Sequence, residues 1–299
     1  MLTADDLLAL VTERFLADRT IKSAVLFGSR ARSGNGIGTA DQWSDLDLHI
    51  ITSAPAALED RAWAASLPGV ELCLHFVRPI PAGVRKVTIL STAGEANLVL
   101  LPAGLLRAVR LAARFGLHRR WKFLRFPLNE MATVMKGGYR FIKGERAWGG
   151  FYAQVTSEMP GRRIDDRAAA LIADNFLWDF LRLIEKLERS ELIEAQRLLH
   201  NFLLEDNLKL LEESRERRKL LTYGGARRAE KLLPPEELSR IRVSARLDAD
   251  ELRAAAWQAR EALEYLMAGL VPAWRPPASF GTLANPLRPG PQRPAGVAR

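Results

Sequence analysis

The segment VLFGSRARSGNGIGTADQWSDLDLHI, residues 25–50, predicts a strand, a turn, a polar loop and a second strand. The apolar residues 25–27 lead directly into Gly28-Ser29, and the second strand carries Asp45 and Asp47 two positions apart. Side chains two apart on a strand leave the same face. Two carboxylates so close repel each other unless a cation lies between them or one is protonated. The alternative is an ordinary solvent-facing pair at the start of a strand.

The Gly-Ser turn gives the aspartate pair a chemical partner. Glycine lets the backbone turn closely, and the hydroxyl of Ser29 and the amides that follow can face an anion. Arg32 adds a cation to this corner. A phosphate site beside a carboxylate pair is what metal-assisted transfer from a nucleoside triphosphate requires. We therefore expect Asp45 and Asp47 to bind Mg²⁺, and Gly28, Ser29 and Arg32 to bind the phosphates.

Hydrophobic periodicity divides the chain into a strand-rich first part and a helical second part. A helix is expected over residues 3–19 and a short helical piece near 56–67. Strands are expected at 21–29, 44–52, 70–77, 84–91 and 96–102, with TAGE, residues 92–95, as the turn of a hairpin. Strand signals then stop. Three long helices are expected at 165–190, 191–221 and 248–270.

Strands followed by helices predict an α+β fold. We expect a small mixed β-sheet domain with flanking helices over residues 1–104 and an all-helical domain over 105–270. Residues 271–299 hold seven of the sixteen prolines and are expected to be a disordered tail.

The composition limits the class of protein. No run approaches the roughly 18 apolar residues of a membrane helix, and the N-terminus carries Asp5, Asp6 and Glu13 where a signal peptide would be basic. A cytoplasmic protein with no membrane partner is expected. The single cysteine, Cys73, cannot form an internal disulfide and is expected in the core. The net charge of +9 is compatible with a polyanionic ligand such as a nucleoside triphosphate.

Residues 107–148 combine eleven Lys or Arg and two acidic residues with several aromatic residues. Cations interleaved with rings are typical of proteins that bind single-stranded nucleic acid. The competing interpretation, which we favour, is a domain junction whose aromatics are core and whose cations line a triphosphate site. The aromatic residues concerned are Trp121, Phe123, Phe126, Tyr139, Phe141 and Trp148.

The motif GSRAR followed by SDLDLHI resembles the signature of the nucleotidyltransferase superfamily typified by DNA polymerase beta. The resemblance implies that Asp45 and Asp47 bind Mg²⁺, two ions in that superfamily, and that Gly28 and Ser29 hold the β- and γ-phosphates. It also implies a third carboxylate on a later strand, which completes the metal site or activates the acceptor hydroxyl.

A narrower resemblance covers most of the remaining chain. The order of strand, hairpin and helical domain, the segment 175–212 and the stretch TYGGARRAEKLLPPEEL are similar to the aminoglycoside 6-adenylyltransferases. This resemblance implies an adenylyltransferase of the antibiotic-resistance type, with ATP as co-substrate and an aminoglycoside such as streptomycin as acceptor. It places Lys186 near the triphosphate. A polycationic acceptor needs acids, and the helices offer Asp174, Asp179, Glu185, Glu205 and Asp206.

The third carboxylate is the point at which the sequence departs from the family pattern. The matching position in GEANLVLLP is Asn97, whose amide cannot take a proton near neutral pH. Glu71, on an adjacent predicted strand, and Glu95, two residues before Asn97, are the two candidate substitutes. Three other functions stay open: a nucleotidyltransferase acting on RNA or protein, a nucleotide-binding relative that has lost transfer, and a non-catalytic toxin–antitoxin partner.

Overall fold

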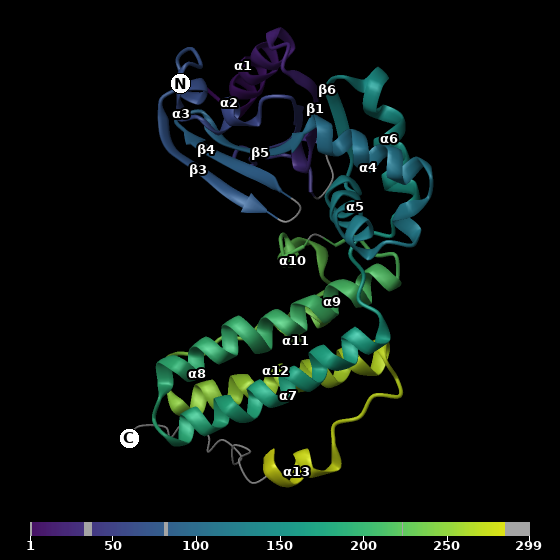
Figure 1. The fold of residues 1–299 in the computed structure, drawn as a ribbon. Helices are drawn as coiled ribbons and strands as arrows, with labels where there is room; N and C mark the ends of the chain where they lie inside the picture. Colours follow the sequence, from purple (N-terminus) through teal and green to yellow (C-terminus); the bar gives the residue numbers. More distant parts are fainter. Residues whose placement is uncertain (1, 33–37, 81–82, 223, 285–299) are drawn as a thin grey trace. The chain divides into compact units, whose positions relative to one another are not determined.

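The computed structural model describes residues 2–32, 38–80, 83–222 and 224–284. The chain divides into two compact units, Met1–Arg162 and Arg163–Arg299, which are described separately. Figure 1 shows the sheet of the first unit and the helices of the second. No helix in these described ranges is long and apolar enough to cross a membrane.

The first unit is built on a six-stranded sheet with the order β3-β4-β5-β2-β1-β6. Only β2 and β5 pair in parallel, and all other neighbours are antiparallel, so the sheet is mixed. This confirms the α+β class and the five predicted strands. The strands are β1 (Ile21–Phe27), β2 (Leu46–Thr52), β3 (Leu72–Ile80), β4 (Val84–Ser91), β5 (Gly94–Pro102) and β6 (Tyr139–Lys143).

Strand β6 corrects the expectation that strand signals end at residue 104. It pairs with β1, Phe27 opposite Tyr139, and its Lys143 ammonium donates to the carbonyl oxygens of Phe15 and Asp18 at the end of α1 (Ala4–Ala17). A five-residue strand between basic and aromatic residues has no distinctive periodicity of its own. Because β6 completes the sheet, the first unit extends to Arg162 rather than to residue 104.

One face of the sheet packs on α1, α2 (Pro55–Glu59) and α3 (Arg61–Ala65). Alternate strand residues fill this core, as the period of two requires. Leu26, Leu48 and Leu98 come from neighbouring strands and pack with Phe15 and Trp63 of the helices.

The opposite face packs on α4 (Ala103–Arg114), α5 (Lys122–Met135) and α6 (Glu145–Glu158). Val25, Phe27 and Ile51 of the sheet meet Leu106 and Tyr152 of the helices in this second core. Asp47 and Asn97 lie opposite one another in the sheet, and Asp47 also lies opposite Phe27, so this face also carries the candidate site.

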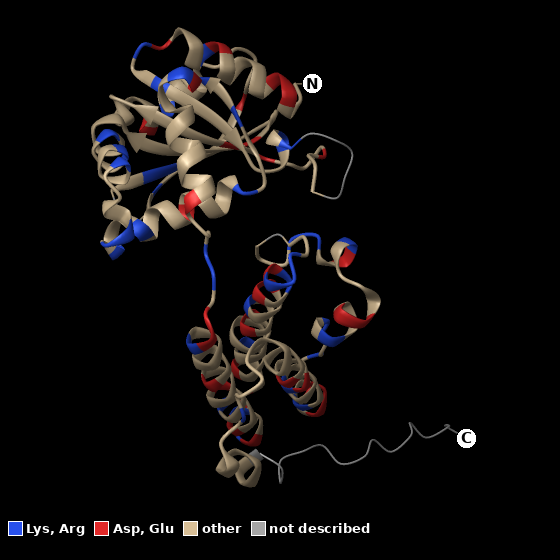
Figure 2. Ribbon diagram, turned by 90° about the vertical axis from the view of Figure 1, so that its right-hand side faces the viewer, with Lys and Arg blue, Asp and Glu red and all other residues tan. Residues whose placement is uncertain are grey.

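Residues 107–148 lie within the first unit rather than at a domain junction, and the expectation that their aromatic residues are core holds for only half of them. Trp148 is in the core, and Tyr139 and Phe141 pack against it. Trp121, Phe123 and Phe126, however, are 46%, 68% and 55% exposed. Figure 2 shows where Lys and Arg (blue) and Asp and Glu (red) lie along the ribbon of each unit.

The edge strand β3 explains a second incorrect expectation. No described strand pairs with its outer side, and most of its side chains are exposed. Cys73 on β3 is exposed rather than in the core. An apolar run is therefore not sufficient to place a strand in the interior.

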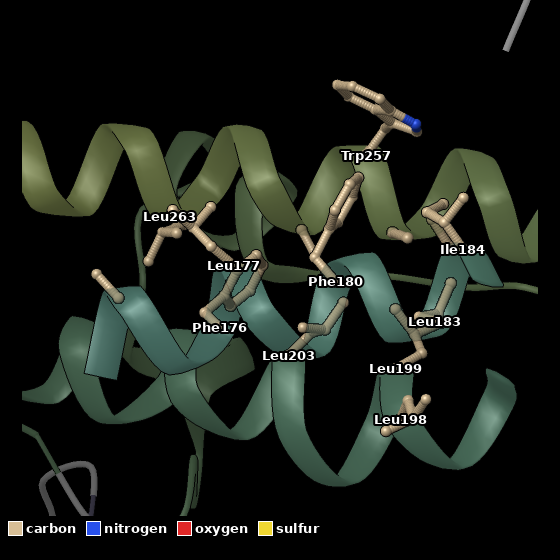
Figure 3. Close-up of a cluster of buried hydrophobic side chains, with 14 of the residues drawn as sticks. Phe176, Leu177, Phe180, Leu183, Ile184, Leu198, Leu199, Leu203, Trp257 and Leu263 are labelled. Carbon is tan, nitrogen blue, oxygen red and sulfur yellow. The ribbon is translucent and has the colours of Figure 1, made fainter. Parts of the chain in front are cut away.

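The second unit is helical, as expected. The predicted helix over 191–221 is divided into α8 (Leu192–Leu198), a π-helical segment η3 (Leu199–Leu204) and α9 (Glu205–Arg217). These pack with α7 (Asp166–Glu188) and α12 (Ala249–Leu270) around Phe176, Phe180 and Trp257 (Figure 3). The shorter helices are α10 (Ala229–Leu232), α11 (Pro235–Ile241) and α13 (Ala278–Ala284). Part of the expected tail is thus helical, and residues 285–299 lie outside the described residues.

Candidate functional site

The Gly-Ser turn and the aspartate pair meet at one end of the sheet. Phe27, the last residue of β1, lies opposite Asp47 of β2, so the next residue, Gly28, turns against the aspartate. Gly28 has φ 77° and ψ −153°, a conformation that is almost confined to glycine. A Cβ at Gly28 would lie only 2.7 Å from Oδ2 of Asp47. The glycine therefore permits both the turn and the close approach of a carboxylate.

Two arginines hold the turn in place. Ser29 begins the short 3₁₀ segment η1 (Ser29–Ala31). The Arg30 guanidinium lies 2.7 Å from Asp5 of α1 and donates to the carbonyl oxygen of Ser44, just before the aspartate pair. The Arg32 guanidinium donates to the carbonyl oxygens of Gly137 and Gly38. These contacts fix the turn between α1, the end of α5 and the start of β2. A contact of Arg32 with phosphate stays a prediction.

Asn97 joins the carboxylates. It lies opposite Asp47 in the parallel pair of β2 and β5. Its Nδ2 donates to Oδ2 of Asp45 at 2.7 Å and to Oε1 of Glu95 at 3.1 Å. The Thr88 hydroxyl on β4 donates to Oδ1 of Asn97 at 2.8 Å and so fixes the orientation of the amide. The departure from the family pattern thus lies within the cluster, because Asn97 contributes a donor where a third acid was expected.

Glu95 belongs to this cluster because the hairpin turn is shorter than predicted. Strand β4 ends at Ser91 and β5 begins at Gly94, so only two of the four TAGE residues form the turn. Glu95 is therefore on the strand, shares a face with Asn97 and is exposed, whereas Asn97 is only 3% exposed. Of the two candidate substitutes for the third carboxylate, Glu95 is the one in the cluster, because the Asn97 amide bridges its carboxylate to that of Asp45.

Glu71 lies away from the cluster. It precedes β3, and its carbonyl oxygen accepts from the Thr92 amide at the hairpin turn. Glu71 thus lies at the start of β3, and β3 is three strands away from β2 in the sheet order, about 14 Å at ~4.8 Å per strand. The expectation that Glu71 points toward the aspartates from an adjacent strand is therefore wrong.

The donor set fits a hard divalent cation. Asp45 and Asp47 carry carboxylate oxygens, the ligands that Mg²⁺ prefers, and Mg²⁺ sites commonly use one or two carboxylates completed by substrate phosphates. Across the described ranges, no group of three or more His, Cys, Asp or Glu side chains is placed so that it could hold a metal ion. Binding of Mg²⁺ by Asp45 and Asp47 stays a prediction.

His49 and Tyr152 lie beneath the site and were missed from the sequence. His49, two residues after Asp47, is 5% exposed, and its ring lies 4.7 Å from that of Phe27 and 6.3 Å from that of Tyr152. Burial lowers the pKa of His49 to about 3, so its ring is neutral near pH 7. An isolated histidine in an apolar run carries no signal that separates it from an ordinary core residue. Here it supports the strand that carries Asp47.

Lys186 and the candidate acids for a polycationic acceptor all lie in the second unit. The Lys186 ammonium is 2.6 Å from a Glu191 carboxylate oxygen. Asp179, Glu185 and Asp206 pair with cations one turn away on their own helices, and Asp174 accepts from the Trp274 indole. Roles for Lys186, for these acids and for Glu205 stay predictions.

Comparisons with known proteins give only distant structural matches. No family model matches the sequence, and a search of curated proteins gives no significant match. The chain is similar to the crystal structure of an aminoglycoside 6-adenyltransferase from Bacillus subtilis, with 11% identity over 96% of this chain and 98% of that one and a TM-score of 0.40.

A second similar structure is a nucleotidyltransferase-like protein from Exiguobacterium sibiricum 255-15, with 11% identity over 92% of this chain and 76% of that one and a TM-score of 0.33. The names of both proteins belong to the nucleotidyltransferase class, whose sequence motifs this chain resembles.

Proposed function

We propose that the unit Met1–Arg162 is a nucleotidyltransferase that transfers AMP from ATP to a hydroxyl group and releases pyrophosphate. The observation that supports this most is the seating of Gly28 against Asp47, next to the cluster of Asp45, Asn97 and Glu95. In this arrangement, a turn that suits phosphate binding lies next to oxygen ligands that suit Mg²⁺. Mg²⁺ is the cofactor that these ligands suit, and ATP is the co-substrate that the resemblance to the adenylyltransferases implies.

Each residue has a role in this proposal. Asp45 and Asp47 would hold Mg²⁺, which when bound neutralises phosphate charge and helps to orient the triphosphate. Ser29 and the amides that follow Gly28 bind the terminal phosphates, and the rigid turn keeps them in position for the leaving pyrophosphate. The buried Phe27 and His49 keep the strand ends beneath the site in register.

Glu95 is the group of the cluster suited to accept the proton of the acceptor hydroxyl. The Asn97 amide is held by Asp45, Glu95 and Thr88 and has no basic atom near neutral pH. Glu95 is exposed and ends in a carboxylate on the same face. General-base help is worth about 10² to 10⁴ in rate, so a functional Glu95 would compensate for the missing third acid.

The acceptor that the sequence resemblance names is an aminoglycoside. Its hydroxyls suit the proposed reaction. This assignment rests on the resemblance of residues 175–212 and of the TYGGARRAEKLLPPEEL stretch, and it is the part of the proposal that a panel of acceptors must decide.

The experiment incubates the full chain with labelled ATP, Mg²⁺ and a panel of aminoglycosides and measures pyrophosphate release and labelled acceptor. Wild type should label at least one acceptor, and Asp45→Asn should label none. Release of no pyrophosphate with any acceptor would contradict the aminoglycoside assignment.

A second function is favoured by one observation, the donor character of Asn97 at the position expected for an acid. If wild type binds ATP with Mg²⁺ but transfers nothing, while Asn97→Asp gains transfer, the chain is a nucleotide-binding relative that has lost the reaction.

A further inference from the structure

The start of α5 and the segment before it form an exposed surface that the proposed reaction does not use. Residues 107–126 contain seven Lys or Arg and no Asp or Glu. Four rings are exposed there: Phe115 by 73%, Phe123 by 68%, Phe126 by 55% and Trp121 by 46%. We call Phe115, Trp121, Phe123 and Phe126 with Arg114, Arg119, Arg120, Lys122 and Arg125 the ring–cation surface.

Most cations of the ring–cation surface are not neutralised by the chain. The side chains of Arg114, Arg120, Lys122 and Arg125 make no hydrogen bond or ion pair with any described residue. Arg119 lies 3.3 Å from Glu158, which also contacts His118. A group of unpaired cations with one shared acid concentrates anions at this part of the surface.

The rings offer flat faces rather than a buried core. Trp121, the residue that precedes α5, and Phe123 stack with ring centroids 5.5 Å apart and an angle of 22° between their planes. Both project into solvent, although burial of such rings is strongly favourable. A stacked and exposed pair is suited to a further planar group.

The combination of rings and cations indicates which polyanion fits. Residues 119–126 read Arg-Arg-Trp-Lys-Phe-Leu-Arg-Phe, so each of the three rings is next to a cation in the sequence. A single nucleic-acid strand alternates phosphates with unpaired bases, and proteins hold it with basic grooves and stacking rings.

We infer that the ring–cation surface binds single-stranded nucleic acid. Bases stack on Trp121 and Phe123, and Arg120, Lys122 and Arg125 contact the phosphates. The interaction is sequence-tolerant, because every base presents a flat face. The inference concerns binding and holds whether or not the chain transfers a nucleotide.

Helix α5 connects this surface to the candidate site within one unit. It has 14 residues from Lys122 to Met135, about 21 Å at 1.5 Å per residue. Just beyond its end, the Gly137 carbonyl accepts from Arg32 of the Gly-Ser turn. The ring–cation surface and the Gly-Ser turn thus lie near opposite ends of α5.

The test measures binding of a fluorescein-labelled 15-nucleotide single-stranded RNA to the full chain by anisotropy at several salt concentrations. We expect Trp121→Ala/Phe123→Ala to weaken binding by about tenfold or more, since stacking is worth ~1–3 kcal/mol per base. Arg120→Gln/Lys122→Gln should reduce the slope of log K against log salt by about 1.4, or ~0.7 for each lost phosphate contact.

Matched controls use exposed residues elsewhere. Trp178→Ala, on α7 and 65% exposed, and Arg61→Gln/Arg167→Gln should bind like wild type. Trp121→Phe should retain most of the affinity, because it keeps a ring, and thermal unfolding reports whether each variant folds. Binding of the same strand as a duplex should be much weaker.

Four results would overturn the inference. They are no binding by folded wild type, equal binding by Trp121→Ala/Phe123→Ala, duplex binding as tight as single-strand binding, and sedimentation with phosphatidylserine vesicles without binding of RNA. The last result would assign the surface to an anionic membrane instead.

Discussion

The Asn97 amide donates a 2.7 Å hydrogen bond to the Asp45 carboxylate. In doing so it offers a proton to the carboxylate that is expected to face Mg²⁺. It also bridges Asp45 to Glu95. Without a metal, this bridge reduces the repulsion between acids at the strand ends. With a metal, the same amide competes for the Asp45 oxygen.

Asn97→Asp should therefore strengthen Mg²⁺ binding and weaken the metal-free protein. The variant loses two hydrogen bonds to charged groups and gains a like charge, for which we expect about 2 kcal/mol less stability without metal. Thermal unfolding with and without Mg²⁺ measures both effects as a lower metal-free Tm and a larger rise on adding the ion. Thr88→Val is the control. It removes only the bond to Oδ1 and should leave the response to Mg²⁺ unchanged.

Glu95→Gln should reduce nucleotide transfer by about 10²-fold or more, the contribution of a general base, with the fold intact because Glu95 is exposed. The rate of pyrophosphate release measures this. Glu71→Gln is the matched control, an equally conservative change near the same hairpin but away from the aspartates. If Glu71→Gln were the damaging change, the assignment of Glu95 would be wrong.

Gly28→Ala should lower stability by about 2 kcal/mol or more and reduce Mg²⁺ affinity. Its backbone conformation is costly for alanine, and the added Cβ would displace the Asp47 carboxylate. Gly116→Ala provides the comparison, since Gly116 has φ +71° but nothing within 4 Å of the added Cβ. That variant should lose about 1 kcal/mol and keep its metal affinity. Urea unfolding and metal titration of both proteins separate strain from displacement.

Acid should destabilise the helical unit through Glu213. Burial raises the pKa of its carboxyl, but hydrogen bonds from Arg163, the Ile164 amide and Arg217 outweigh it, so the pKa lies below its usual value of 4.5. A lowered folded-state pKa stabilises the fold above pH 4.5, and this stability is lost as the pH falls below 4.5 through the folded-state value.

Glu213→Gln should cost on the order of 2 kcal/mol at pH 7 and remove part of the pH dependence. Urea unfolding of the second unit between pH 7 and pH 3 measures the difference. Equal slopes for the two proteins across this range would contradict the role of Glu213.

The sequence predicts most of the first unit because its signals are local. The apolar residues 25–27 identify β1, alternation from Asp45 onward identifies β2, and a Gly-Ser turn before two aspartates two positions apart identifies the site. Strand β6 depends on pairing with β1 more than a hundred residues earlier, which no local pattern contains. Glu95 lies on the strand because the hairpin turn has two residues rather than the four that the sequence predicts. The difference between Glu95 and Glu71 depended on strand order, which periodicity does not report.

Exposure was also hard to predict. Cys73 lies in an apolar run and Trp121 lies between basic residues, and both were expected in the core, yet both are exposed. Cys73 lies on an edge strand, and Trp121 lies at the start of a helix whose other face packs on the sheet. Type and spacing of residues do not distinguish such positions from core, since apolar atoms form much of any protein surface.

The central claim is that Asp45 and Asp47 bind a divalent cation together with a nucleoside triphosphate. Its most direct test is titration of Mn²⁺, as a substitute for Mg²⁺, into the full chain with ATP, followed by electron paramagnetic resonance. We predict that wild type and Asp60→Asn, a change at a helix cap away from the site, bind Mn²⁺ alike, and that Asp47→Asn binds at least tenfold more weakly. Equal Mn²⁺ binding by folded Asp47→Asn and wild type would contradict the account.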